Sequence, residues 1–392
     1  MEREAMNTRP RIEWVDRPQA LDALAADLRS ASSIAVDTEQ DSFFSYRTKV
    51  CLLQIGVPGR AWIVDPLALS DLSALRPALE DPAIPKIVHA GDNDIALLKR
   101  DAGIRIRGLF DTMLAASILG YPRTGLAALL DEHFGLKLEK KYQRSDWRKR
   151  PLELGQVAYA AEDVLHLERL RDALAPQLAA KDRVDEAESE FARIEASEPE
   201  EKEFDPESYF RIEGAPDLDP VCRRVLRDVY VMREEIAKRE DRARFRVVGD
   251  ESLLLLARTK PSDMGTLRRV HGLSDVFLKQ HGQRVLELVQ AANEAGPLAP
   301  PPRKPFQDRA GQSALDVVQK KLFDKLRDWR AARAAERGVE VGRVIPNQLL
   351  VKVVLAGART KDDLKRVGFE AWRLRVWGEA FAAELARLSP KP

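Results

Sequence analysis

The sequence predicts an α/β domain with a mixed sheet flanked by helices, followed by two small all-α bundles. Three observations lead to this prediction. Short runs rich in β-branched residues alternate with amphipathic segments in residues 1–180. An acidic stretch and a proline-rich stretch then interrupt the chain. The two segments that they delimit share one pattern of apolar residues.

We assign the α/β domain to residues 1–180. Its β-rich runs predict strands at residues 33–36, 50–56, 61–64 and 86–89. Its amphipathic segments predict helices at residues 71–80, 92–101, 112–119, 125–134 and 152–174. Because turns separate the first three strands, we expect an antiparallel meander there, which makes the sheet mixed.

Two breaks in composition divide the rest of the chain. Residues 181–212 are rich in acidic side chains and are expected to form an exposed linker. Residues 296–308 contain a run of prolines and predict a semi-rigid linker. The helical segments between and beyond these breaks are residues 213–295 and 309–392.

The two helical segments look like copies of one unit. At an offset of 97 residues Arg233 falls on Arg330, and apolar positions fall on apolar positions. After a gap of one residue, Gly282 falls on Gly378. One offset that holds over this length predicts two copies of a compact helical bundle, and neither copy carries a catalytic motif.

Composition excludes several classes of protein. The 392 residues carry a net charge of +1, so any attraction to nucleic acid must come from local basic patches. Cys51 and Cys222 lie far apart and predict buried thiols rather than a disulfide, and no Cys/His spacing indicates zinc. We find no apolar leader and no membrane-spanning run, and therefore expect a cytoplasmic protein with no membrane association.

The stretch Asp37-Thr38-Glu39 follows a short apolar strand. Side chains two apart in a strand point to the same face, so the two carboxylates are expected to lie side by side. Adjacent carboxylates repel each other unless a cation lies between them or one is protonated. Since Mg²⁺ and Mn²⁺ prefer oxygen ligands, the pair suggests a metal-assisted phosphoryl-transfer site, although a solvated strand end has the same pattern.

Further side chains fall where such a site needs them. Asp94 lies one turn into a predicted helix, and we interpret Asp92 as the N-cap of that helix. Tyr159 and Asp163 are four residues apart in a later helix and therefore share one face, whereas Glu162 is expected to be a solvated charge.

These side chains suit one reaction. Two metal ions can stabilise the attacking and leaving oxygens of a displacement at phosphorus. Four carboxylates would supply the negative charge: Asp37, Glu39, Asp94 and Asp163. A tyrosine has an ordinary pKa of about 10, so Tyr159 is a candidate for orienting a water molecule rather than for removing its proton.

The motifs resemble those of a known family. Asp37-Thr38-Glu39, Asp94 and Tyr159-x-x-x-Asp163 are similar to the three exonuclease motifs of the DEDD superfamily, tyrosine subtype. Neighbouring motifs narrow the resemblance to ribonuclease D: Cys51-Leu52-Leu53-Gln54-Ile55, His89-Ala90-Gly91, Phe110-Asp111-Thr112, Ser145-Asp146-Trp147 with Arg150-Pro151-Leu152, and Tyr159-Ala160-Ala161-Glu162-Asp163. The helical repeats resemble the helicase-and-RNase-D C-terminal (HRDC) domain, present twice.

The resemblance implies a ribonuclease H-like fold and a hydrolase that uses two divalent ions, Mg²⁺ or Mn²⁺, to release 5′-mononucleotides from the 3′ end of RNA. It implies that Asp37, Glu39 and Asp163 hold one ion and that Asp37 bridges to the second. It also implies that Asp94 supports the site through water and that Tyr159 positions the nucleophile. The implied substrates are precursor tRNA 3′ ends and single-stranded 3′ tails. We expect a monomer with no obligate protein partner.

Candidate substrate contacts are less sharply defined by the motifs. In the α/β domain they are Thr38, Phe43, Tyr46, His89, Asp111, Gln143, Trp147 and Arg150. For Asp111 a helix cap is the alternative. Trp147 and Arg150 belong to a basic run with interleaved aromatics, within which Gln143 also lies. Such a run suits single-stranded nucleic acid, and its basic and aromatic members are Lys140, Lys141, Tyr142, Arg144, Trp147, Arg148, Lys149 and Arg150. A solvated loop with Trp147 in the core is the alternative for this run. In the first repeat the candidates are Arg239, Arg242, Arg244 and Arg246.

Two other functions fit part of the same pattern. The carboxylates also suit a 3′–5′ exonuclease that acts on DNA, because no motif reports a contact with the 2′-hydroxyl that distinguishes RNA. A non-catalytic nucleic-acid-binding protein would rely on the helical repeats alone, and the complete acidic set argues against it.

Overall fold

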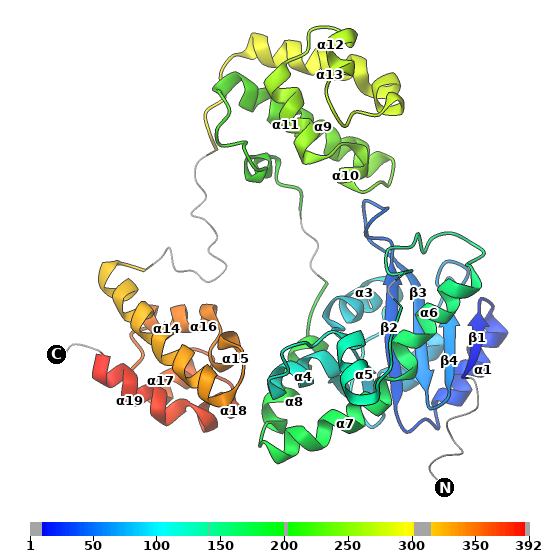
Figure 1. Cartoon of the computed structure of the whole chain (residues 1–392), viewed down its shortest axis with the longest axis vertical. Helices are drawn as coiled ribbons and strands as arrows, with labels where there is room; N and C mark the ends of the chain where they lie inside the picture. The colour runs from blue at the N-terminus through cyan, green and yellow to red at the C-terminus, as the bar shows by residue number, and fades with distance from the viewer. Residues whose placement is uncertain (1–9, 140, 200–202, 302–314, 389–392) are drawn as a thin grey trace. The chain divides into compact units, whose positions relative to one another are not determined.

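The β-rich runs form one six-stranded sheet in the computed structural model, which describes residues 10–139, 141–199, 203–301 and 315–388 (Figure 1). The strand order is β1-β4-β3-β2-β5-β6. The strands are β1 (Arg11–Val15), β2 (Ile34–Gln40), β3 (Val50–Val57), β4 (Arg60–Val64), β5 (Lys86–Val88) and β6 (Leu109–Asp111).

Strand pairing confirms that the sheet is mixed. β3 and β4 are antiparallel, and Val57 pairs with Arg60 across the turn that joins them. The pairs β1–β4, β2–β5 and β5–β6 are parallel. The sequence did not predict β1 and β6. β6 has only three residues, and β1 is partly exposed, so neither has the continuous apolar run of a central strand.

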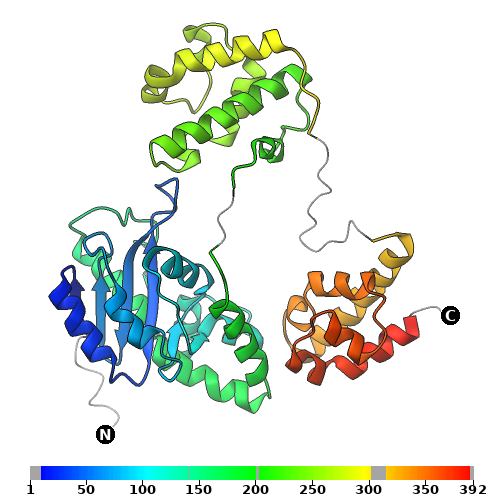
Figure 2. The ribbon, with the colours of Figure 1, turned by 180° about the vertical axis from the view of Figure 1, so that it is seen from behind.

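Helices cover both faces of the sheet (Figures 1 and 2). On one face α6 packs Ala160, Ala161 and Val164 against Ala35 and Ile63 of the strands. The other face is covered by a larger core that includes residues of α1, α3, α4, α5, α7 and α8. The helices of this domain are α1 (Pro18–Leu28), η1 (Ser73–Leu75), α2 (Arg76–Leu79), α3 (Asp92–Ala102), α4 (Thr112–Leu119), α5 (Leu126–Phe134), α6 (Leu154–Leu165), α7 (Leu167–Ala180) and α8 (Val184–Glu195).

Two helix predictions and one linker prediction need correction. The helix expected at residues 152–174 is two helices, α6 and α7, because the backbone of His166 leaves helical geometry at φ −110° and ψ −4°. The helix expected at residues 71–80 is a 3₁₀ turn followed by one turn of α-helix. The acidic linker expected at residues 181–212 begins instead with α8, whose Ala187, Phe191 and Ile194 are buried in the core.

The C-terminal half contains two helical bundles, each with a core of its own. The first consists of η2 (Pro206–Arg211), α9 (Pro220–Arg239), α10 (Arg244–Val247), α11 (Asp250–Thr259), α12 (Met264–Arg268) and α13 (Asp275–Ala295). The second consists of α14 (Val317–Arg337), α15 (Val341–Val344), α16 (Asn347–Leu355), α17 (Lys361–Arg366), α18 (Ala371–Val376) and α19 (Gly378–Leu388).

The bundles repeat one another element by element. The first four α-helices of the two bundles begin at positions 97 residues apart, and α18 begins 96 residues after α13, as the one-residue gap predicts. A buried arginine also recurs. Arg233 donates to the carbonyl of Val248 at 3.0 Å, and Arg330 donates to that of Ile345 at 2.7 Å. The second copy differs in that its last helix is interrupted at Trp377.

The described residues group into two compact units. One contains residues 10–39, 50–199 and the second bundle, and the other contains residues 40–49 and the first bundle. Residues 200–202 and 302–308 of the two expected linkers lie outside the described residues, as does Lys140. Cys51 and Cys222 are both buried free thiols, as predicted. Within the described ranges, no helix has the length and hydrophobicity that crossing a bilayer requires.

The arginine that recurs in both bundles gives a test of the repeat. Arg330→Met keeps most of the side-chain volume but leaves the Ile345 carbonyl without its buried donor. We expect the free energy of opening of α16 to fall by about 1–3 kcal/mol, measured by amide hydrogen exchange in the full chain. Arg327→Met, in the same helix but 56% exposed, is the control and should leave exchange unchanged. Equal protection in both variants would show that the bond does not hold the bundle together.

Candidate active site

β2 and two helices bring four carboxylates together. Asp37 and Glu39 lie two apart on β2, Asp94 lies in the first turn of α3, and Asp163 lies in α6. Burial raises the pKa of Asp37 well above its usual range, and the charges of Asp94, Asp163 and Glu39 add to this effect. Their mutual influence shows that strand, helix start and late helix converge on one place, as the sequence predicted.

The pKa values of Glu39 and Asp163 are raised as well. Burial, followed by the charges of Asp163 and Asp94, raises the pKa of Glu39 to about 9. Burial and the charge of Glu162 raise the pKa of Asp163 to about 7. Carboxyls in this state hold protons near neutral pH, and a cation that bound among them would displace those protons.

The structure distinguishes between the two acids at the start of α3. Asp94 is partly buried and accepts a hydrogen bond from the hydroxyl of Thr38, a residue that is itself 7% exposed. Thr38, expected to contact substrate, therefore holds Asp94. Asp92 is exposed, and the N-cap of α3 is Gly91 rather than Asp92. The cap interpretation of Asp92 is wrong, because the helix begins one residue earlier.

Tyr159 lies beside the carboxylates. It is on the same face of α6 as Asp163, four residues away. Burial, and then the charges of Asp163, Glu39 and Asp37, raise the pKa of its phenol above the ordinary value. The phenol therefore stays protonated at neutral pH and can donate a hydrogen bond, but it cannot accept a proton as a phenolate would.

Asp111 fixes the turn that leads into α3. Its fully buried carboxylate accepts hydrogen bonds from the backbone N–H groups of Ala90 and Gly91 at 3.2 and 2.9 Å. It also caps α4 by accepting from Met113 and Leu114. The interpretation of Asp111 as a cap is confirmed, and its carboxylate has four N–H partners rather than a substrate.

His89, in the same turn, is a neutral side chain. Its Nδ1 lies 2.9 Å from the hydroxyl oxygen of Thr112, and that hydroxyl donates to the carbonyl of Val88. The histidine therefore donates from Nδ1. Burial lowers the pKa of His89 to about 4, so it supplies no positive charge to a phosphate at neutral pH.

The basic run that precedes α6 is anchored rather than loose. All five N–H groups of Arg150 have acceptors, which are both oxygens of Asp65 and the carbonyls of Cys51, Trp147 and Lys149. Arg150 thus has no N–H left for a substrate phosphate. Trp147 is 1% exposed and belongs to the core beneath α6, so the alternative given for it, a core residue, is the one observed.

Other members of the predicted contact set lie apart from this core. Gln143 is exposed in the turn at residues 141–144. Phe43 is 46% exposed, and the segment that carries it belongs to the unit of the first bundle. Tyr46, in the same segment, donates from its hydroxyl to Glu234, which also pairs with Arg244. Tyr46 therefore fastens this segment within its unit instead of presenting a free ring.

The donor chemistry of the four carboxylates fits divalent metal ions, whereas their present spacing does not yet enclose one. Among the described residues, no group of three or more Asp, Glu, His or Cys side chains is arranged closely enough to hold a metal ion. The oxygens are hard ligands, and their charges are near enough to raise one another's pKa. A cation bound among these carboxylates would offset their repulsion.

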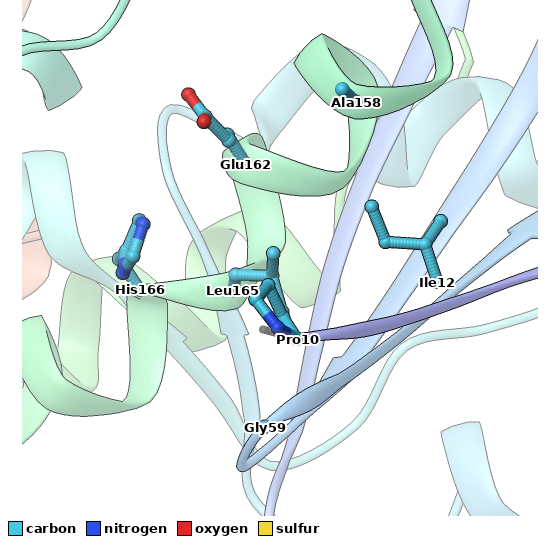
Figure 3. Close-up of a pocket in the computed structure, with 7 residues that line it drawn as sticks. All are labelled: Pro10, Ile12, Gly59, Ala158, Glu162, Leu165 and His166. Carbon is cyan, nitrogen blue, oxygen red and sulfur yellow. The ribbon is translucent and has the colours of Figure 1, made fainter. Parts of the chain in front are cut away.

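A pocket of about 510 Å³ lies on another face of α6 (Figure 3). Its lining includes Ile12 of β1, Gly59 in the β3–β4 turn, and Glu162 and His166 at the end of the helix. Neither the four carboxylates of the candidate site nor Tyr159 lines this pocket. Glu162 is exposed here, as predicted.

The sequence did not predict the buried partners of two residues near the site, Arg150 and His89. Asp65, with a side chain 4% exposed, is the partner of Arg150, and Thr112 is the partner of His89. The position of Asp65 could have indicated such a partner. It follows the apolar strand β4 directly, and a carboxylate buried there needs a positively charged partner.

Family models match both the α/β domain and the two helical bundles. A model described as a 3′–5′ exonuclease matches residues 12–179, and the HRDC domain model matches twice, at residues 223–289 and 319–385. The exonuclease match contains all four carboxylates and Tyr159. The HRDC matches fall on the two bundles.

Known proteins extend this result to most of the chain. Ribonuclease D of Gluconacetobacter diazotrophicus is 31% identical over 366 residues, covering 92% of this chain and 90% of the relative. The exosome complex exonuclease RRP6 of Saccharomyces cerevisiae is 32% identical over 71% of this chain, but the chain spans only 40% of that relative. Among solved structures, RNase D of Escherichia coli has a TM-score of 0.64 at 25% identity, over 96% of this chain and 99% of that chain. An exonuclease domain followed by two HRDC domains, with a relative similar over nearly its whole length, shows that the chain belongs to the ribonuclease D family of 3′–5′ exoribonucleases.

Proposed function

We propose that this chain uses two divalent metal ions to hydrolyse RNA from its 3′ end and to release 5′-mononucleotides. The observation that carries the proposal is the group of four buried or partly buried carboxylates, in which burial and mutual repulsion raise the pKa of Asp37 and Glu39. Exonucleases of this family generally depend on divalent metal ions. A cluster of carboxylates in such a domain is where those ions would bind.

The four carboxylates would have different roles in binding the two ions. Asp37, Glu39 and Asp163 would hold one ion, and Asp37, whose pKa is raised by burial and by the three neighbouring carboxylates, would also hold the second. Asp94, one of whose oxygens accepts from Thr38, would act through water. When bound, the ions would lower the pKa of a water molecule and offset the charge that develops on the phosphate.

Tyr159 would orient the water that attacks phosphorus. Its phenol keeps its proton at neutral pH, so it can donate one hydrogen bond but cannot serve as the base. A group that orients the nucleophile acts mainly in the transition state, so its loss should lower kcat more than it raises KM.

We propose that the substrate is the single-stranded 3′ end of an RNA. In the cell, the proposed substrates are precursor tRNA and other stable RNAs. The solved Escherichia coli relative is described as an exoribonuclease involved in structured RNA processing, and we extend that role to this chain. Lys141 and Lys149, two exposed members of the basic run, would face the phosphates. Because all five residues of the site come from one chain, we also propose that it acts as a monomer.

Removing one carboxylate tests the site. Asp37→Ala should lower the rate of RNA degradation in Mg²⁺ or Mn²⁺ by about 10²-fold or more, because the ions lose a shared ligand. Asp92→Asn is the matched control, since it removes an exposed acid close to Asp94 in the chain and should leave the rate unchanged. The assay uses 3′-tailed RNA and DNA oligonucleotides of the same sequence. Faster turnover of DNA would reverse our choice of substrate, and full activity of Asp37→Ala would refute the site.

The raised pKa values predict how pH acts on the metal-free protein. Carboxyls of Glu39 and Asp163 titrate near 4.5 and 3.8 when unperturbed, but in the fold their pKa values are about 9 and about 7. Between these limits the folded state holds more protons than the unfolded state, so the free energy of unfolding falls as pH rises. Glu39→Gln, which cannot ionise, should therefore be more stable than the natural chain at pH 8.5, and the difference should shrink at pH 5.

The size of this effect is on the order of 1–2 kcal/mol once solvent screening is allowed for. It is measured as hydrogen-exchange protection of β2 in EDTA, corrected for the intrinsic exchange rate at each pH. Glu132→Gln, an exposed change in α5, is the control. Adding Mn²⁺ should remove the disadvantage of the natural chain at high pH. Parallel pH profiles for Glu39→Gln and the natural chain would contradict the prediction.

A further inference from the structure

The ring of Tyr159 lies against two aromatic side chains from the segment before its helix. The ring centroids of Trp147 and Tyr159 are 6.1 Å apart, and the planes are stacked at 26°. Those of Tyr142 and Tyr159 are 6.4 Å apart at a tilt of 59°. Gly155, in the first turn of α6, makes room for this arrangement, because a Cβ atom there would overlap the hydroxyl of Tyr142.

Ring packing is what fixes the phenol. Among the residues that the structure describes, none forms a hydrogen bond with the Tyr159 hydroxyl. The position of that hydroxyl therefore depends on the two side-chain torsions of the tyrosine, and neighbouring rings restrict both. Of these neighbours, Tyr142 is partly exposed, whereas Trp147 is 1% exposed. The indole is thus the rigid surface against which the ring rests.

Core packing and a backbone hydrogen bond fix the position of Trp147. It shares a core with Ala160, Ala161 and Val164 of α6. Its carbonyl accepts a hydrogen bond from Arg150 at 2.8 Å, and Arg150 forms a two-pronged ion pair with Asp65 at 2.6 Å for each prong. A bidentate pair with a buried carboxylate is geometrically strict, so it fixes the backbone that carries the indole.

We propose that Trp147 is a positioning residue for hydrolysis, which sets the place of the Tyr159 hydroxyl by stacking and is itself located by the Arg150–Asp65 ion pair. This inference rests on the proposed function, because it assumes that Tyr159 acts on the attacking water. It assigns Trp147 a role that excludes stacking on a nucleotide base, since the indole is covered. A misplacement of about 1 Å in a catalytic group can cost about 10²-fold in rate, so a smaller side chain at this position is expected to matter.

Two variants of Trp147 test the proposal. Trp147→Leu removes the stacking surface and should lower kcat about 10-fold while KM changes less than about twofold. Trp147→Phe keeps an aromatic ring, removes no hydrogen bond within the described part of the chain, and should restore most of kcat. Trp62→Phe is the matched control, because Trp62 is 3% exposed on the opposite face of the same sheet. It should leave both constants unchanged.

A double-mutant cycle separates positioning from general support of the fold. If Trp147 acts through Tyr159, then Trp147→Leu should cause no further loss of kcat once Tyr159→Phe is present. Asp65→Asn, which weakens the ion pair, should lower kcat in the natural chain and also lose its effect in the Tyr159→Phe background. Equal losses in both backgrounds, or a rise in KM with kcat unchanged, would overturn the proposal.

A second measurement needs neither metal nor activity. The metal-free protein is labelled with 3-fluorotyrosine, and the ¹⁹F signal of Tyr159 is identified by its absence in Tyr159→Phe. That signal should shift in Trp147→Leu and Asp65→Asn but not in Trp62→Phe. An unmoved signal would overturn the proposal even if activity falls. If Tyr159→Phe keeps full activity while the signal shifts, the packing inference holds and the role given to Tyr159 in the proposed function fails.

Discussion

Repulsion among carboxylates held in one place is the constraint on which the exonuclease domain depends. Asp37 and Glu39 cannot separate, because alternation along β2 fixes them on one face. Asp94 and Asp163 come from α3 and α6, two helices that follow that strand in the chain, and their charges also raise the pKa of Asp37 and Glu39. A fold that buries like charges must gain rigidity elsewhere, or the elements that carry them would drift apart.

The surrounding polar residues supply that rigidity. The Asp111 carboxylate binds four backbone N–H groups around the start of α3 and α4. The Arg150 guanidinium uses all its N–H groups on Asp65 and on three carbonyls. Both side chains lie in motifs that resemble those of ribonuclease D, and the sequence therefore suggested that they contact the substrate. Their saturated hydrogen bonding shows instead that both side chains hold the backbone around the site.

Local patterns in the sequence predicted more of this molecule than long-range partners did. Alternation and helical spacing placed Asp37, Glu39, Asp94, Tyr159 and Asp163, because each rule acts within a few residues. A single offset revealed both bundles. The charge of residues 181–212 concealed α8, since its acidic face outweighed three buried apolar positions. The pairing of Arg150 with a residue 85 positions earlier has no local signature, so the sequence suggested a phosphate contact instead.

The bundles have a consequence for how the chain unfolds. Each has a hydrophobic core of its own, and the exonuclease domain has others. A chain built this way need not lose its structure in one cooperative step, so a single melting temperature does not describe it. The first bundle and most of the exonuclease domain belong to different compact units, so heat or denaturant can open that bundle while the sheet stays folded. Loss of signal in a bulk unfolding curve and loss of catalysis can therefore be separate events, and each needs its own probe.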